Sequence, residues 1–329
     1  PDYQAALAVL EKAKLANPND AYVKLAMGDA YYGLKNQNDA YSAYRDAYNT
    51  DKNLIRAKMQ LGVLLKGAKA YVEAVKAYDE VVSIDPNYGP VYRELAETYY
   101  LWASNKPATY KENIAKALSN YEKYMSLTDY SLSSRMRHAD FLILAKEYKE
   151  LEKEALEMKK MDKVNPRILR YLGYAAYENG NTDEAINALT EFLGKATKII
   201  GGDYYFLGLA QVKKSIGADG KTIDATLLAQ GVAHLKKAVE MDMNLANGLN
   251  EIGKAYFGQK LYGVAAGVFE AAILNTTSKN FFEDNIYYGL CVHTVNRGKD
   301  VKSIDLPALT NADKAMDNVI AAKPEYPEA

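Results

Sequence analysis

The chain has 329 residues, of which 49% are hydrophobic and 25% are charged, so its composition excludes disordered and collagen-like proteins. Forty-one basic residues balance 42 acidic ones, and the formal charge of −1 argues against a nucleic-acid binder that works through a strong overall positive field. One cysteine, Cys291, excludes an internal disulfide, and three histidines leave few metal ligands, so we expect neither a metal nor a cofactor. No apolar run approaches the roughly 20 residues of a membrane helix, so we expect no membrane insertion.

The apolar residues follow helical spacing from the start of the chain. The first predicted element is a lone helix at Asp2–Ala16. Two further helical segments, Tyr22–Leu34 and Asn38–Thr50, are separated by a short polar turn at 35–37. Because a short turn joins two segments of helical length, they predict a helix–turn–helix unit.

The same unit recurs every 34 residues. Four sets of positions share this period: Ala6, Ala40 and Ala74; Leu10, Tyr44 and Tyr78; Pro18, Lys52 and Pro86; and Gly28, Gly62 and Ala96. A fixed period of this length predicts a stack of helical repeats. We expect one solenoid domain over 1–329, with a half repeat at 1–20 and full repeats at about 21–54, 55–88, 89–131, 132–165, 166–200, 201–245, 246–281 and 282–324. The pattern is weakest in 132–165, where Leu151 and Ala155 replace the usual alanine and aromatic residue.

Each predicted first helix (helix A) carries a glycine or alanine near its middle, such as Gly28 or Gly62. Small residues at these positions let helix A approach the second helix of the repeat (helix B) closely. Large residues of helix B, such as Tyr44, Tyr78 and Phe269, are expected to fill the gap to the next repeat.

Three repeats are longer than 34 residues, and their extra residues fall between helix A and helix B. The insertions are at about Ala103–Tyr110, Gly217–Leu228 and Arg297–Thr310. Loops at equivalent turns of a solenoid emerge along one edge, so we expect these three on one rim. Neutral surface elaboration is the alternative, because long surface loops cost little stability.

Two segments carry a pattern that resembles a known family. The matching residues are Leu61-Gly62, Ala74, Tyr78 and Pro86 in one segment, and Ile252-Gly253, Tyr256, Ala265 and Phe269 in the other. They resemble the tetratricopeptide repeat, and the resemblance covers nearly the whole chain. It implies an all-α solenoid, coiled as a right-handed superhelix, whose helices A line a concave groove that binds proteins or peptides.

The family rule that positions 2, 5, 9 and 12 of helix A face the groove can be carried over to this chain. It selects aromatic, basic and amide residues that we expect to contact a partner: Tyr22, Tyr32, Arg56, Lys66, Arg93, Tyr100, Arg167, Arg170, Tyr174, Tyr177, Tyr205, Asn250 and Lys254. The rule also selects apolar residues, among them Leu209 and Val212.

Arginine is concentrated on the predicted helices A, which carry six of the eight arginines of the chain. Arginine and tyrosine are enriched at protein–protein hot spots, so this surface favours a protein or peptide partner, and an acidic one. The alternative is that Asp29, Glu97 and Asp140 neutralise the arginines across adjacent helices. The family's clamp for chaperone tails is absent, since Arg93 and Glu97 occupy positions where it has lysine and asparagine.

The sequence offers no candidate catalytic constellation. His138, His234 and His293 lie on separate predicted helices, and Cys291 lies between Leu290 and Val292 and reads as a buried apolar residue. We therefore predict a non-enzymatic scaffold or adaptor that binds a segment of another protein. The alternative is a self-assembling structural element, or a subunit of an envelope complex, that uses its solenoid ends and rim loops.

Both ends of the array are expected to expose apolar surface. The helix at Asp2–Ala16 has no helix A before it, and the last helix B, at about Ala312–Ala322, has no capping helix after it. We expect the natural chain to extend further, or the ends to be covered in a homo-oligomer. The missing initiator methionine slightly favours a bacterial cell-envelope protein with its export signal removed over a cytoplasmic one.

Overall fold

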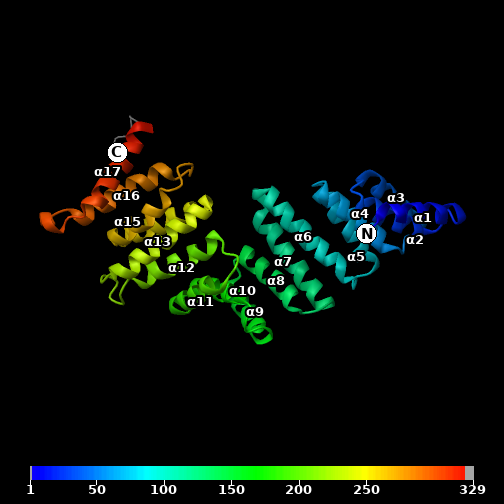
Figure 1. The fold of residues 1–329 in the computed structure, drawn as a ribbon, viewed down its shortest axis with the longest axis horizontal. Helices are drawn as coiled ribbons and strands as arrows, with labels where there is room; N and C mark the ends of the chain where they lie inside the picture. The colour runs from blue at the N-terminus through cyan, green and yellow to red at the C-terminus, as the bar shows by residue number, and fades with distance from the viewer. Residues whose placement is uncertain (1, 323–329) are drawn as a thin grey trace. The chain divides into compact units, whose positions relative to one another are not determined.

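The structure is a computed structural model that describes residues 2–322 of the chain (Figure 1). These residues form seventeen α-helices and no β-strand, which confirms the all-α prediction. The helices are α1 (Tyr3–Ala16), α2 (Ala21–Gly33), α3 (Gln37–Thr50), α4 (Ile55–Gly67), α5 (Tyr71–Ile84), α6 (Gly89–Asn105), α7 (Tyr110–Leu127), α8 (Leu132–Ala145), α9 (Tyr148–Met161), α10 (Pro166–Glu178), α11 (Thr182–Lys195), α12 (Gly201–Lys214), α13 (Ala225–Met241), α14 (Ala246–Gly258), α15 (Tyr262–Ala272), α16 (Phe281–Asn296) and α17 (Leu306–Ala322).

The chain divides into two compact units, and each is described by itself. Unit 1 spans Pro1–Glu147 and contains α1 to α8, and unit 2 spans Tyr148–Ala329 and contains α9 to α17. The division falls inside the segment 132–165, where the repeat pattern is weakest. The single solenoid domain over 1–329 stays a prediction.

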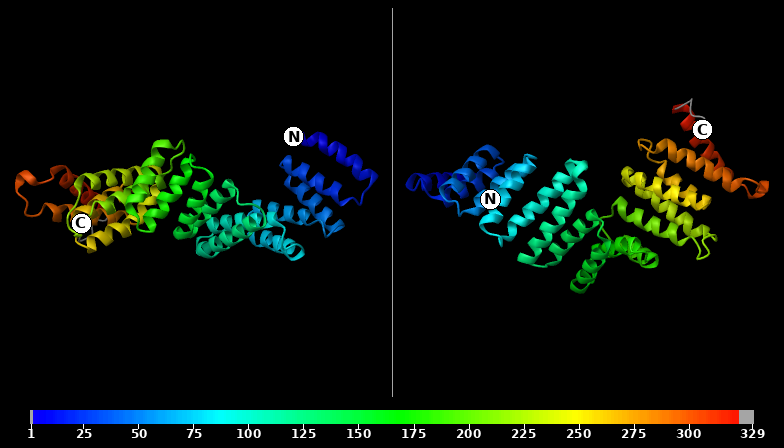
Figure 2. Two further views of the ribbon diagram at one scale, coloured as in Figure 1. Left: turned by 90° about the horizontal axis from the view of Figure 1, so that it is seen from below. Right: turned by 180° about the vertical axis from the view of Figure 1, so that it is seen from behind.

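Consecutive helices pack as pairs within each unit (Figure 2). In unit 1 the pairs are α2 with α3, α4 with α5 and α6 with α7, and in unit 2 they run from α10 with α11 to α16 with α17. The first helix of each pair is its helix A. The long connections α12–α13 and α16–α17 lie between helix A and helix B as expected. The expected insertion at Ala103–Tyr110 is not a long loop, because the extra residues of this repeat lengthen α6 and α7 to 17 and 18 residues and leave only 106–109 between them.

The short turns from helix A to helix B share one backbone conformation. Lys35, Lys69 and Lys260 have φ of 61°, 61° and 62°, which places them in the left-handed region. After Lys69, the N–H of Ala70 donates to the carbonyl oxygen of Leu65 at 2.9 Å, and the same bond joins Asn36 to Tyr31 at 3.0 Å. This arrangement is a Schellman motif, which satisfies the last carbonyl groups of helix A and reverses the chain into helix B.

Glycines of helix A lie directly under large side chains of helix B. A Cβ atom on Gly62 would overlap the ring of Tyr78, and one on Gly28 would overlap the ring of Tyr44. The large residue therefore packs over the glycine of its own pair, because the glycine leaves room for a whole aromatic ring. It also shares an apolar cluster with the next repeat, as expected, since Tyr44 clusters with Leu61 of α4 and Tyr78 with Leu95 of α6.

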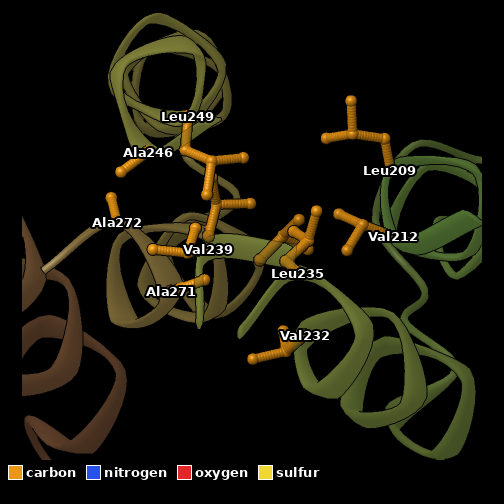
Figure 3. Close-up of a cluster of buried hydrophobic side chains, with 11 residues drawn as sticks. Leu209, Val212, Val232, Leu235, Val239, Ala246, Leu249, Ala271 and Ala272 are labelled. Carbon is orange, nitrogen blue, oxygen red and sulfur yellow. The ribbon is translucent and has the colours of Figure 1, made fainter. Parts of the chain in front are cut away.

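One apolar cluster in unit 2 joins α12, α13, α14 and α15 (Figure 3). Leu209 and Val212 of α12 belong to it, together with Leu235 of α13 and Leu249 of α14. The groove positions selected at Leu209 and Val212 are therefore wrong, since both side chains are buried between helices. No helix within residues 2–322 combines the length and the apolar character that crossing a membrane requires.

Candidate functional site

In unit 1 the predicted partner-binding residues lie on three helices A. Tyr22 and Tyr32 belong to α2, Arg56 and Lys66 to α4, and Arg93 and Tyr100 to α6. Tyr22 and Tyr32 are 68% and 45% exposed, although both are large and partly apolar. We call Tyr22, Tyr32, Arg56 and Arg93 the unit 1 face.

Several cations of the helices A in unit 1 are paired with carboxylates of a neighbouring helix A. The guanidinium group of Arg56 lies 2.6 Å from a carboxylate oxygen of Asp29, which also accepts a hydrogen bond from the hydroxyl group of Tyr44 at 2.9 Å. Lys66 donates to Glu94 at 2.6 Å. Arg137 of α8 donates two hydrogen bonds to Glu97 of α6, at 2.7 and 3.0 Å. Asp29 and Glu97 therefore neutralise arginines of adjacent helices, namely Arg56 and Arg137.

Arg93 is the most exposed basic residue of the unit 1 face. Its side chain is 53% exposed, and it lies 3.5 Å from Glu94, which also receives the hydrogen bond from Lys66. Its guanidinium group lies 6.0 Å from the ring centre of Tyr124. Tyr100, by contrast, is half-buried and packs edge-on against Phe141.

In unit 2 the strongest of these pairs is buried. Arg170 of α10 donates to both carboxylate oxygens of Asp203 of α12, at 2.7 and 2.8 Å, and the two side chains are 12% and 0% exposed. Tyr174 donates its hydroxyl proton to the same carboxylate at 2.8 Å, and the backbone N–H of Ile200 donates to it at 2.8 Å. Burial first, and then the charge of Asp203, raises the pKa of Tyr174 well above its usual range.

This network corrects two predicted contact residues. Arg170 and Tyr174 hold α10 and α12 together, so their polar atoms are not available to a partner. Asn250 is also buried, and its amide group donates to Asp284 at 2.7 Å and to Glu283 at 3.0 Å. The family rule placed these three side chains at a surface, whereas the structure places them between helices.

The remaining predicted residues of unit 2 are partly covered. Tyr177 and Tyr205 are half-buried around the ring of Phe206, and burial raises the pKa of Tyr205 to about 12. Lys254 lies 3.1 Å from Glu251 and 3.4 Å from Glu283. The guanidinium group of Arg167 lies 5.6 Å from the ring centre of Tyr171.

Sequence reasoning missed the acidic residues that pair with the predicted contact residues, namely Asp203, Glu283, Asp284 and Glu94. Their spacing carries the signal that could have found them. Arg170 and Asp203 are 33 residues apart, and Asn250 and Asp284 are 34 apart, which is about one repeat. A polar residue on helix A and an acid one repeat later lie on adjacent helices A, so such pairs predict hydrogen bonds between repeats.

Burial of Asp284 has an electrostatic consequence. Its carboxyl group is fully buried, and its Oδ2 atom has no hydrogen-bond partner among the described residues. Burial raises the pKa of Asp284 from 3.8 to about 6, against the opposing effect of the hydrogen bond from Asn250. The protonated form therefore gains stability in the folded protein.

The residues considered for catalysis lie apart. His138 is on α8, His234 on α13 and His293 on α16. Cys291 is buried, and burial raises the pKa of its thiol to about 12. Within residues 2–322, no group of three histidine, cysteine or acidic side chains is placed to hold a metal ion.

Three hollows of the surface lie away from the predicted contact residues. In unit 1, α7 and α8 line a hollow of about 530 Å³ with Ile114, Leu118 and Leu144. In unit 2, α13, α15, α16 and α17 line two adjoining hollows of about 530 and 270 Å³. None of the thirteen predicted contact residues lines these three hollows.

Comparison with known proteins identifies a repeat family and several solved folds. Residues 146–197, which contain α9 to α11, match the family model of the tetratricopeptide repeat. The chain is similar to the C-terminal part of a TPR repeat-containing protein from Cytophaga hutchinsonii, at 17% identity, 82% coverage of this chain, 97% coverage of that chain and a TM-score of 0.49. It is also similar to a tetratricopeptide repeat protein from Parabacteroides merdae, at 14% identity, 73% coverage of this chain, 87% coverage of that chain and a TM-score of 0.45.

A third solved structure is that of YrrB, described as a TPR protein with an unusual peptide-binding site. It is 15% identical, and the match covers 62% of this chain and 94% of that chain with a TM-score of 0.46. No curated protein sequence matches the chain.

Proposed function

We propose that this chain, which is a tetratricopeptide repeat protein, is a non-catalytic scaffold that binds a segment of another protein on the unit 1 face. Repeats of this family build protein-interaction scaffolds, and stacked helix pairs present long surfaces suited to that role. The binding residues are Tyr22 and Tyr32, with Arg56 and Arg93 beside them.

The observation that carries this proposal is the exposure of Tyr22 and Tyr32 on one helix A. A tyrosine ring offers a large contact area at a low cost in side-chain entropy, and its hydroxyl group adds a directional hydrogen bond. Buried tyrosines of this chain, such as Tyr44 and Tyr78, pack over glycines. Tyr22 and Tyr32 are exposed instead, and this supports a role outside the core.

The ion pairs within the chain reduce the positive charge that is available to attract an acidic partner. Asp29 already compensates Arg56, so on this face the attraction for an acidic segment rests mainly on Arg93. We therefore infer that the partner is held mainly by contacts with the two tyrosine rings. Its affinity should fall only weakly as the salt concentration rises, because few net charges are neutralised on binding.

Site-specific photo-crosslinking tests the proposal. A photoreactive phenylalanine replaces Tyr22 or Tyr32 in the full chain, and Tyr41 on helix α3, which is also an exposed tyrosine, is the matched control position. We expect one discrete cross-linked partner from positions 22 and 32 but not from 41. Substitution Tyr22→Ala should then weaken binding of that purified partner by about tenfold or more, as at a typical hot spot. A partner that cross-links equally from all three positions would contradict the proposal.

Self-assembly is the second candidate, and α1 favours it. Val9 and Leu15 on this first helix are 67% and 81% exposed. Apolar side chains exposed together on one helix can be covered by a second copy of the chain. Sedimentation of the purified chain and of the double variant Val9→Asp, Leu15→Asp separates the two functions. A dimer that the variant abolishes supports self-assembly, whereas a monomer in both leaves the scaffold function alone.

A further inference from the structure

The smaller of the two adjoining hollows in unit 2 has a chemical character unlike the unit 1 face. It measures about 270 Å³. Its lining includes Asn311, Lys314 and Asn318 of α17, and Ile273 and Leu274, which follow α15. A volume of this size lies just below the usual range for small-molecule pockets.

Three polar side chains of α17 face this hollow without partners in the described part of the chain. Asn311, Lys314 and Asn318 are spaced i, i+3 and i+7, so they share one face of the helix. All three are exposed, and no hydrogen bond or ion pair joins their side chains to another described residue. Lys236, which lines the same hollow, is paired with Glu270 at 2.6 Å.

Three apolar side chains also line this hollow. Ile273 and Leu274 follow α15, and Phe281 begins α16. Leu274 is exposed, and the other two are half-buried. The lining also includes Asn285 and the ion pair of Lys236 with Glu270, so Lys314 is the lining cation whose charge is not already compensated by a described carboxylate. A ligand of this hollow therefore meets this cation, side-chain amides and apolar surface together.

We propose that this hollow binds an extended segment of a partner protein, in which an acidic side chain pairs with Lys314 while Asn311 and Asn318 hydrogen-bond the main chain. Lys314 has no carboxylate partner among residues 2–322 and supplies the complementary charge. A side-chain amide can donate to a main-chain carbonyl group and accept from a main-chain N–H.

The spacing of the two asparagines selects a polypeptide over a small carboxylate. Seven residues along α17 place Asn311 and Asn318 about 10 Å apart, at 1.5 Å per residue. An extended segment covers that distance in about three residues, at 3.3 Å each. A small carboxylate that pairs with Lys314 does not reach both amides.

This site is separate from the proposed function, because it lies on α15, α16 and α17 of unit 2 and shares no residue with the unit 1 face. Loss of one site therefore leaves the other intact. The two proposals fail independently.

Methyl NMR of the full chain tests the proposal with defined probes. One probe is a pool of acetylated hexapeptides with glutamate at the third position and mixed aliphatic and aromatic residues elsewhere, and the matched pool has glutamine there. We expect the methyl signals of Ile273 and Leu274 to shift with the glutamate pool at millimolar concentration, and to shift much less with the glutamine pool. The variant Lys314→Glu should weaken the response by about tenfold or more, as expected for loss of a charge-assisted hydrogen bond.

The control variant is Lys12→Glu, which makes the same charge change at an exposed lysine of α1. Its response should equal that of the unchanged chain. No shift with the glutamate pool, equal shifts with both pools, or an undiminished response of Lys314→Glu would overturn the proposal. It would also be overturned if Glu325→Gln with Glu328→Gln shifted the same signals without peptide, because the chain's own acidic segment would then be the occupant.

Discussion

Two glycines of α4 show what a single residue contributes to the packing of a helix pair. A Cβ atom on Gly62 would overlap the ring of Tyr78, whereas one on Gly67, at the end of the same helix, would meet no atom within 4 Å. The two positions have the same residue type and the same helix, but only Gly62 faces α5 closely. Position 62 therefore requires glycine for contact, and position 67 does not.

Substitution Gly62→Ala should lower the free energy of unfolding by about 1–3 kcal/mol, because the added methyl group overpacks the contact with Tyr78. Gly67→Ala is the matched control and should raise stability by up to about 1 kcal/mol, since alanine is the better helix former. Urea unfolding followed by circular dichroism measures both. Equal effects of the two substitutions would mean that the contact with Tyr78 does not limit the approach of the helices.

Arg170 and Arg93 occupy equivalent positions of their repeats but differ in side-chain exposure. Arg170 pairs with the fully buried carboxylate of Asp203, whereas Arg93 is mostly exposed. Removal of Arg170 leaves a buried charge without its cation. Removal of Arg93 leaves Glu94 still paired with Lys66.

Substitution Arg170→Met should therefore cost about 3 kcal/mol of stability, as expected when one partner of a buried ion pair is removed. Arg93→Met, which makes the same chemical change, should cost less than about 0.5 kcal/mol. Thermal unfolding of the two variants compares them directly. If Arg170→Met unfolds at the same temperature as the unchanged chain, the buried charge of Asp203 does not need Arg170 for stability.

Asp284 gives the stability of unit 2 a pH dependence. Its pKa is about 6 in the folded chain against 3.8 for an unperturbed carboxyl group, because burial disfavours the charged form. The folded state therefore binds a proton that the unfolded state has lost between these values. The stabilisation from this proton is complete below pH 3.8 and is lost as the pH rises through 6.

Substitution Asp284→Asn should remove this dependence, since an amide does not titrate and still accepts the hydrogen bond from Asn250. At pH 8 the variant should be more stable than the unchanged chain by about 2 to 3 kcal/mol, and the difference should shrink toward pH 4. Unfolding midpoints across this range measure the effect. Glu283→Gln, at the neighbouring and more exposed carboxylate, is the control and should show no comparable trend.

At the scale of the element, short turns from helix A to helix B have the same backbone conformation in both units. A lysine with positive φ follows α2, α4 and α14, and the next N–H reaches back to a carbonyl group of the preceding helix. Glycine adopts this conformation without strain, whereas a side chain with a Cβ atom does not. The hydrogen bonds of the turn hold the lysine there.

Substitution Lys69→Gly should therefore stabilise the chain, by about 0.5–1 kcal/mol, because it relieves the strain of the left-handed conformation. Lys76→Gly, within helix α5, is the contrasting change and should destabilise by about 1 kcal/mol. Chemical denaturation distinguishes the two signs. A loss of stability in Lys69→Gly would show that the lysine side chain, and not the backbone, stabilises this turn.

At the scale of the whole molecule, contacts are local along the chain. Each helix packs mainly against its neighbours in sequence, within pairs and between successive pairs of the same unit. Stability in such an array is a sum of terms for single repeats and their nearest neighbours. A defect in one pair should therefore open that pair first.

Hydrogen exchange of the variant Gly253→Ala tests this expectation, because a Cβ atom at 253 would overlap the ring of Phe269 between α14 and α15. Exchange should accelerate in α14 and α15 and in the helices next to them. Exchange in α2 to α5 should stay unchanged. Uniform acceleration along the chain would show one cooperative unit instead of a sum of local ones.

The helices and their pairing follow from local information. Helical spacing of apolar residues, the 34-residue period and the glycines at 28, 62 and 253 all describe contacts within one helix or one pair. Such contacts join residues close in sequence, so the pattern that produces them is visible there. The all-α fold and the place of the two long insertions of unit 2 could be predicted for this reason.

The state of each charged side chain follows from the tertiary structure. Arg93 and Arg170 are the same residue at the same position of helix A, and the sequence pattern treats them alike. Asp203, one repeat further on, lies fully buried in the first turn of α12 and accepts two hydrogen bonds from Arg170, while Arg93 has no fully buried carboxylate beside it. Burial and pairing depend on how two successive helices A approach each other. That geometry arises only when the repeats pack, so the packed structure alone decides which predicted contact residues remain available to a partner.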